Sequence, residues 1–138
     1  MTKQIPKSLQ KAFQSYRLAE NEMSRPAEDA VVFCACSSMR NSINIFLLSF
    51  LASKSVQIAG EKKFNDLLQY CKKLDPQFKA IDLSCFVCKN NDGGNCNEHY
   101  CLSPDKVSEC FTQTKMVKNL VLAKMEISEK ELEDVLID

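Results

Sequence analysis

The segment from Pro26 to Lys54 constrains the fold most, because no proline or glycine interrupts it after its first residue. Apolar side chains recur along it at three- and four-residue spacing, on one helical face: Val31, Ala35, Met39, Ile43, Phe46 and Phe50. From Ile43 to Ala52 it is apolar on nearly every side, as in a helix surrounded by neighbours. This run is shorter than the roughly 20 residues that cross a bilayer. The segment therefore predicts the central helix of a soluble bundle, with no membrane partner.

Other segments carry helical signals around this central helix. An apolar stripe predicts a first helix over Ile5–Met23, and a second stripe predicts a third helix over Phe64–Leu74. Asp75-Pro76 starts a short fourth helix, with Asp75 as N-cap and the proline in the first turn. Ser103-Pro104 opens a last long helix that reaches Met125 in the same way.

The end of the chain predicts a separate short helix. Ser128 and Glu131 form a capping box, and Ile127 with Leu132 forms the matching hydrophobic staple, so a helix is expected from about Glu129. This acidic helix either folds back on the bundle or docks on another subunit. We expect one all-α domain over residues 1–138, an up-and-down bundle of five to six helices, with 127–138 as an accessory helix. An irregular Cys-, Gly- and Asn-rich loop precedes the last long helix.

Charge and cysteine content narrow the class of protein. Eighteen basic and eighteen acidic residues cancel, so there is no strong signature of a nucleic-acid partner. The N-terminus lacks the apolar region of a signal peptide, which predicts a cytoplasmic protein. Eight cysteines in a reducing compartment are expected to be mainly free thiols, several of them small buried hydrophobes.

Four cysteines flank the Gly-rich loop and form a candidate metal site. Cys85 and Cys88 make one CxxC pair, and Cys96 and Cys101 follow within the same loop. Zn²⁺ prefers four thiolate or imidazole ligands in tetrahedral geometry, which this set could supply. The alternative is that the first pair packs into the bundle and the second pair is unliganded. No cofactor is expected apart from this zinc hypothesis.

Three residues are candidates for binding a ligand. Arg40 is the one charged residue between Val31 and Ala52, so it either forms a polar site between helices or lies over the bundle with its stem packed. His99 is the only histidine and is followed by Tyr100. No Ser/His/Asp or Cys/His/Asn framework of known spacing surrounds His99, so no catalytic residue is assigned.

The order of these motifs resembles the HEPN superfamily of helical domains over roughly Lys7 to Met125. The resemblance rests on four segments of this chain: Phe64-Asn65-Asp66-Leu67-Leu68, Leu74-Asp75-Pro76-Gln77-Phe78, His99-Tyr100 and Ser103-Pro104. Members of that family include metal-independent RNases with an Arg-x(4–6)-His motif, nucleotide-binding domains and partners of nucleotidyltransferases. This chain lacks the RNase motif, because no arginine follows Arg40.

The resemblance implies a non-catalytic, HEPN-like module for protein interaction, expected as a homodimer. It further implies a nucleotide ligand or a nucleotidyltransferase partner. Two other hypotheses remain open. One is a divergent RNase-like or nucleotide-processing enzyme that uses His99 and Tyr100, and the other is a small zinc-stabilised helical domain built on the loop from Cys85 to Cys101.

Overall fold

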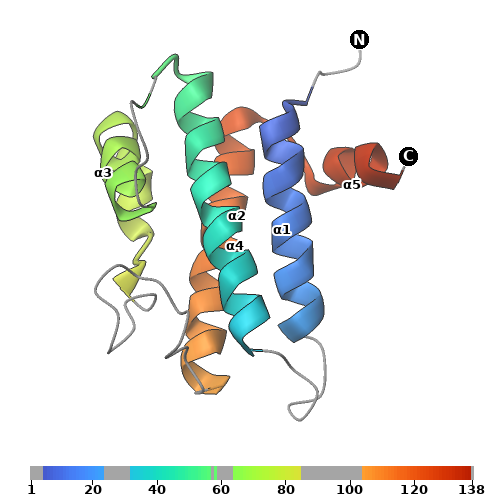
Figure 1. The fold of residues 1–138 in the computed structure, drawn as a ribbon. Coiled ribbons are helices and arrows are strands. Elements are labelled where there is room, and N and C mark those ends of the chain that lie inside the picture. The colour runs from blue at the N-terminus through green and yellow to red at the C-terminus, as the bar shows by residue number, and fades with distance from the viewer. Residues whose placement is uncertain (1–4, 24–31, 57, 59–63, 85–103, 138) are drawn as a thin grey trace.

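The computed structural model describes residues 5–23, 32–56, 58, 64–84 and 104–137. Within these ranges the chain forms five α-helices, one 3₁₀ helix and no strand (Figure 1): α1 (Lys7–Met23), α2 (Val32–Ser53), α3 (Phe64–Leu74), η1 (Pro76–Ala80), α4 (Pro104–Met125) and α5 (Glu129–Ile137). The predicted all-α class is confirmed. The predicted Cys/Gly/Asn-rich loop falls in 85–103, outside the described residues. None of the described helices has both the length and the apolar character needed to cross a membrane.

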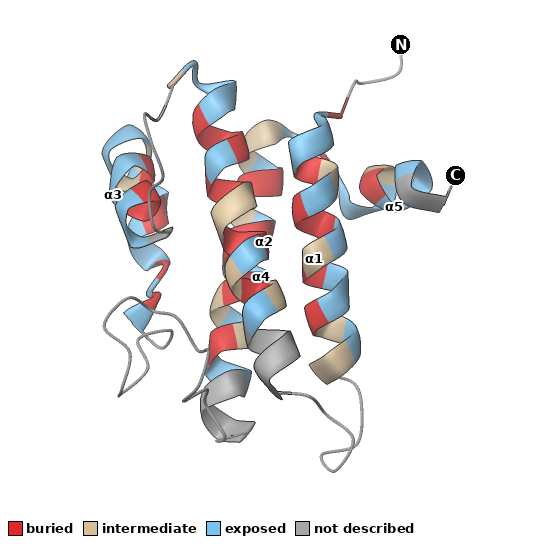
Figure 2. Ribbon diagram, viewed as in Figure 1, coloured by how far each residue is buried: buried red, intermediate tan, exposed pale blue. Residues whose placement is uncertain are grey.

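Helix α2 occupies the centre of the molecule. It packs against α1, α3 and α4, and Figure 1 shows α1 and α3 on opposite sides of it with α4 behind. Its described core residues are fully buried: Met39, Ile43, Phe46, Leu47, Phe50 and Leu51. The members of the predicted stripe whose burial is described, Met39, Ile43, Phe46 and Phe50, therefore face the core, as the buried inner faces in Figure 2 show.

Helices α1 and α2 lie antiparallel, joined by small polar side chains. The Ser42 hydroxyl donates to the carbonyl of Ala12 at 3.0 Å, and the Ser49 hydroxyl donates to the Ser8 hydroxyl at 2.9 Å. Residue numbers rise along one helix as they fall along the other, which fixes the relative direction. Ser42 and Ser49 are buried, and these bonds satisfy hydroxyls that would otherwise be costly to remove from water.

Two helices end on residues in the left-handed region, and neither residue is glycine. Ser55 (φ 62°) follows α2, and the amide of Val56 donates to the Leu51 carbonyl at 2.9 Å. Glu126 (φ 58°) follows α4, with a matching bond from the next amide to the Leu122 carbonyl at 3.0 Å. Both endings are Schellman-type caps, which satisfy carbonyls at a helix end.

The predicted fourth helix forms as the 3₁₀ helix η1. The Asp75 carboxylate caps it by accepting from the amide of Gln77 at 3.0 Å, as the N-cap pattern predicted. Its backbone bonds span three residues, from Phe78 to Asp75 and from Ile81 to Phe78, because the segment is too short for a stable α-helix. Phe78 is fully buried and its ring lies 4.7 Å from that of Phe50, which joins η1 to α2.

The terminal helix α5 begins where the capping box places it. The amide of Glu131 donates to the Ser128 hydroxyl, and the amide of Ser128 donates to the Glu131 carboxylate, both at 3.1 Å. Ile127 and Leu132, the predicted staple, both belong to the core cluster. Figure 1 shows α5 on the side of α1 away from α2, so within this chain the helix folds back on the bundle.

Candidate functional site

The most unusual side chain in the described structure is a buried lysine beneath α5. Lys118, in α4, is only 2% exposed. Its amine lies 2.5 Å from an oxygen of Glu129 at the start of α5 and 4.6 Å from the ring centroid of Tyr16 in α1. A buried ammonium is tolerated only where it is paired, and here a carboxylate and an aromatic face share that role. Lys118 thereby connects three helices.

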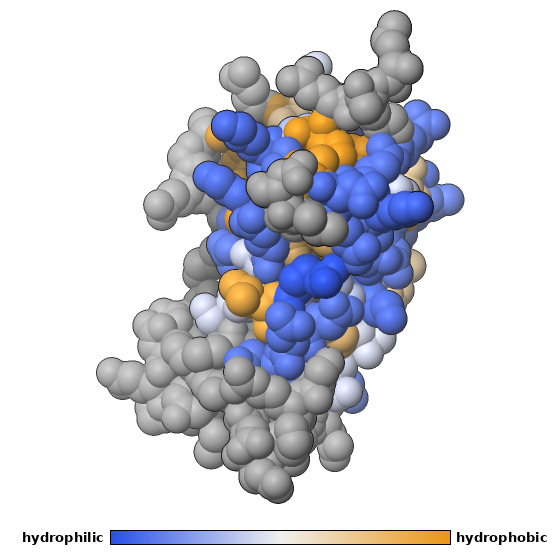
Figure 3. Space-filling model, turned by 90° about the vertical axis from the view of Figure 1, so that its right-hand side faces the viewer, coloured by the Kyte–Doolittle hydropathy of each residue, from blue (hydrophilic) through white to orange (hydrophobic). Residues whose placement is uncertain are grey.

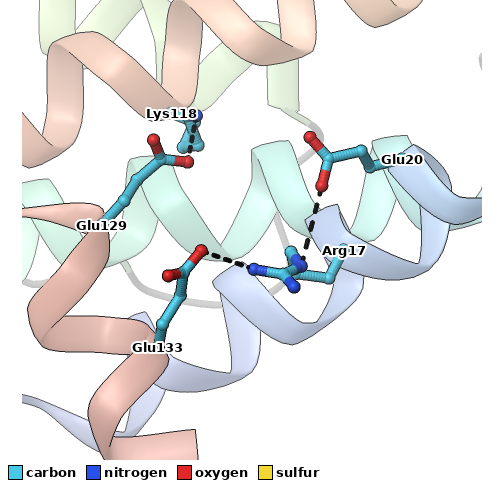
Figure 4. A network of polar contacts seen from close by, with 5 residues as sticks. All are labelled: Arg17, Glu20, Lys118, Glu129 and Glu133. Atoms are coloured by element: carbon cyan, nitrogen blue, oxygen red, sulfur yellow. Dashed lines mark hydrogen bonds and ion pairs between the residues drawn. The ribbon is translucent and has the colours of Figure 1, made fainter.

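A second ion pair holds α5 against α1, one helical turn further along (Figure 4). Arg17 donates to a Glu133 oxygen at 2.8 Å, and its Nε lies 3.6 Å from an oxygen of Glu20. The guanidinium also lies 5.6 Å from the ring centroid of Phe13. The four side chains of the two pairs come from α1, α4 and α5, so we call the surface formed by Tyr16, Arg17 and Lys118 the α5-docking surface.

The Tyr16 hydroxyl in this surface is buried and makes no hydrogen bond of ordinary geometry to any described residue. Burial is the main cause that raises the pKa of Tyr16 to about 12, and the charges of Glu20 and Glu129 add to it. The phenol therefore stays protonated at neutral pH. It can donate a hydrogen bond there but cannot act as a base.

The energetics of the α5 contact are modest. A helix of nine residues is too short to be stable alone. Full burial of Leu132 contributes about 1.5–3 kcal/mol. The Arg17–Glu133 pair, with both side chains nearly half exposed, contributes about 0.2–1 kcal/mol. Attachment of α5 thus depends on a small apolar contact and two ion pairs, one of them partly buried.

A second feature lies on the outer face of α2. Ser37, Asn41, Asn44, Leu48 and Ala52 follow one another at three- and four-residue spacing, and we call them the α2 outer strip. Four of them are exposed and Asn44 is half-buried. None carries a charge. The exposed face of α1, by contrast, carries Lys7, Lys11 and Arg17.

The residues singled out from the sequence are only partly placed. Arg40 lies in α2 with its side chain half-buried. The other candidate ligand residues and the candidate zinc ligands lie outside the described residues: His99, Tyr100, Cys85, Cys88, Cys96 and Cys101. The nucleotide and zinc hypotheses therefore stay predictions.

The two cysteines whose side chains are described, Cys71 and Cys110, behave as buried hydrophobes. Cys71 and Cys110 are both buried, and neither forms a disulfide. Burial raises the pKa of Cys71 to about 12, so its thiol is unreactive at neutral pH. No group of three or more His, Cys, Asp or Glu that could hold a metal occurs in this part of the chain.

Open surface depressions occur at two places among the described residues. One, of about 280 Å³, lies along α3 and is lined by Asp66, Gln69, Tyr70 and Lys73. The other, of about 360 Å³, lies between the end of η1 and α4, and Asp82, Ser84, Glu109, Thr112 and Gln113 line it. Neither contains Lys118 or Arg17, so the α5-docking surface is a contact between helices and not a wall of these depressions.

The sequence pattern missed the role of Lys118, although a signal was present. Lys118 lies four residues after Thr114 and four before Leu122, and both of these are buried. A lysine in register with an apolar stripe is either at its edge or paired inside it. The acidic terminal helix supplies the partner carboxylate, Glu129. The spacing of residues in the sequence does not predict where this helix lies on the bundle.

Comparisons of the chain with protein-family models, with curated proteins and with solved structures returned no match. The two features above are therefore interpreted from their own chemistry.

Proposed function

We propose that this chain is a non-catalytic, HEPN-like helical module, with the up-and-down course of that family, that works by protein interaction and forms a homodimer through the α2 outer strip. The observation that carries the proposal is the lack of charge on a helix face that is exposed in the single chain. From Ser37 to Ser53 the only charged residue is Arg40, which borders the strip, three residues after Ser37 and four before Asn44. Interface cores are depleted in charged residues relative to ordinary surface.

The chemistry of the strip suits a second copy of the same chain. Asparagine amides both donate and accept hydrogen bonds, so Asn41 and Asn44 can pair with their own copies across a two-fold axis. Leu48, which is 38% exposed, supplies an apolar side chain at the same face. The Asn41 amide already donates to the Ser15 hydroxyl at 2.6 Å, which holds its side chain in place before association.

Sedimentation velocity at tens of micromolar tests the proposal. We expect the wild-type chain to sediment as a dimer and Leu48→Lys to sediment as a monomer, because a buried unpaired ammonium would oppose the interface. The matched control is Leu18→Lys, since Leu18 is a more exposed leucine (58%) on α1, outside the strip. A monomeric wild-type chain, or equal effects of the two substitutions, would reject dimerisation through this strip.

A further inference from the structure

The carboxylates of α5 and the cations of the α5-docking surface are matched in position as well as in charge. Glu129 meets Lys118 and Glu133 meets Arg17, and the two glutamates lie four residues apart on one helical face. Leu132, between them in sequence, is fully buried. The surface therefore accepts a helix that presents two carboxylates one turn apart beside a leucine, the pattern Glu-x-x-Leu-Glu.

The surface also has recognition capacity that α5 leaves unused. The hydroxyl of Tyr16 is buried and makes no hydrogen bond of ordinary geometry, although the Glu20 carboxylate on the same helix is close enough to help raise its pKa. An acceptor atom on another helix could accept a hydrogen bond from this hydroxyl. Buried polar groups left unsatisfied oppose the present arrangement, so such a helix would gain an interaction that α5 does not make.

The charges at the α5-docking surface also favour an acidic helix as the ligand. Helix α5 contains four acidic residues and one lysine, and two of its glutamates form ion pairs with Arg17 and Lys118 of the bundle. Figure 3 views the molecule from the α5 side, with α5 in place, and shows a largely hydrophilic face with hydrophobic areas near its top and at mid-height on the left. An amphipathic helix that packs against a bundle, as α5 does, is recognised through a few apolar anchors and flanking charges.

We propose that the α5-docking surface recognises an acidic amphipathic helix of a partner protein, with the pattern Glu-x-x-Leu-Glu, and that α5 is the intramolecular occupant which such a helix displaces. The connection from α4 to α5 is three residues long and includes Glu126 in the left-handed region. Because the helical backbone is already interrupted there, α5 can leave the surface while α4 stays in place. Helix α5 lies on the side of α1 away from α2 (Figure 1), so the contact beneath it is separate from the α2 outer strip and its test does not depend on dimerisation.

Fluorescence anisotropy with the full chain tests the proposal. The probe is a labelled peptide with the sequence of residues 127–137, which carries the required pattern. We expect the double variant Glu129→Gln/Glu133→Gln to bind this peptide at least about tenfold more tightly than the wild-type chain, because its own α5 competes less. Circular dichroism checks that the variant is folded. Leu132→Ala, which weakens α5 through its apolar contact instead, should show the same gain.

Controls on both sides of the contact make the result specific. In the double-variant chain, adding Arg17→Gln should weaken peptide binding, whereas Lys11→Gln, an exposed cation on the same helix, should leave it unchanged. A peptide with glutamine at both glutamate positions of the pattern should bind at least about tenfold more weakly. Dilution into high salt should reduce binding of the acidic peptide only.

Three outcomes would overturn the proposal. Equal peptide affinity of the wild-type chain and both weakened variants would show that α5 does not cover a recognition surface. Displacement of the peptide by inorganic phosphate as effectively as by unlabelled peptide would show a simple anion site. Dimers that form by exchange of α5, without peptide binding, would identify a second copy of this chain as the occupant.

Discussion

At the scale of single residues, the buried amine of Lys118 is the group whose pairing matters most for stability. Its amine is paired with Glu129 and lies over the ring of Tyr16, so removing either partner affects a buried cation. The two members of the pair are not equivalent. Lys118 is 2% exposed, whereas the Glu129 side chain is 48% exposed and can be solvated when its partner is lost. Substitutions at the two positions should therefore have unequal costs.

Glu129→Gln should lower the free energy of unfolding by about 1–3 kcal/mol, because it leaves a buried ammonium without its carboxylate. Lys118→Met should change it by less than about 1 kcal/mol, since methionine keeps the packing of the stem and the exposed Glu129 is hydrated. Urea denaturation of both variants measures the difference. Equal losses would mean that the cost comes from the attraction between the charges and not from burial of the lysine.

Tyr16 should make stability depend on pH in the alkaline range. Its pKa is about 12 in the folded chain, against a usual value of 10.0, so the unfolded chain loses its proton first. Folding stability is then unaffected below about pH 10 and falls as pH rises toward 12. Tyr16→Phe should remove this part of the decline. At neutral pH it should be neutral or stabilising by about 1 kcal/mol, because the buried hydroxyl makes no hydrogen bond of ordinary geometry.

Urea denaturation of the wild-type and Tyr16→Phe chains at about pH 7 and about pH 11 measures this effect. Titration of tyrosine absorbance provides an independent readout, since the wild-type chain should contain one late-titrating phenol that the variant lacks. Identical alkaline loss of stability in both chains would contradict the assignment to Tyr16.

At the scale of elements, α5 is a short helix whose folding depends on its cap and on its contact with the bundle. Its capping box supplies two hydrogen bonds, and Leu132 is its one described, fully buried side chain. Because the attachment is worth only a few kcal/mol, α5 can open without unfolding of the core. Substitutions within α5 therefore cannot destabilise the core by more than the free energy of that attachment.

Ser128→Ala should increase the hydrogen-exchange rates of α5 amides about fivefold or more, since loss of a cap costs about 1 kcal/mol. Amides of α2 should keep their protection. The matched control is Ser108→Ala, because Ser108 is an exposed serine inside α4 whose side chain caps nothing in the described structure. Uniformly faster exchange across α2 and α5 would show that α5 unfolds only with the whole domain.

The sequence was informative about elements wherever a local rule decides the outcome. The Ser128 cap, the Asp75 cap and the core stripe of α2 were predictable because each depends on residues close together in the chain. The 3₁₀ form of η1, the left-handed Ser55 and the burial of Lys118 were not, since each is decided by helices packing from elsewhere. The residues proposed from the sequence to bind nucleotide or zinc, apart from Arg40, lie outside the described ranges.

At the scale of the whole molecule, the buried hydrophobic side chains of α1, α2, α3, η1 and α4 belong to one contiguous cluster, to which α5 adds Leu132 among its described side chains. A single cluster of this kind favours one cooperative unfolding transition. Helix α3 and η1 depend on this cluster for their position, because Phe78 and Leu67 are fully buried on the side of α2. A lysine–carboxylate contact from Lys124 to Asp75, at 2.8 Å, also ties the start of η1 to α4.

Phe78→Ala should therefore destabilise the entire molecule by about 3–5 kcal/mol, because it removes a fully buried ring that contacts Phe50 and leaves a cavity. Chemical denaturation should show a lower midpoint with an unchanged slope, as expected for a loss of stability within one cooperative unit. Leu132→Ala is the comparison, since its cost is limited by the attachment of α5. A reduced slope for Phe78→Ala, or a separate early transition, would mean that α3 and η1 form an independently unfolding unit and that cooperativity resides in α1, α2 and α4.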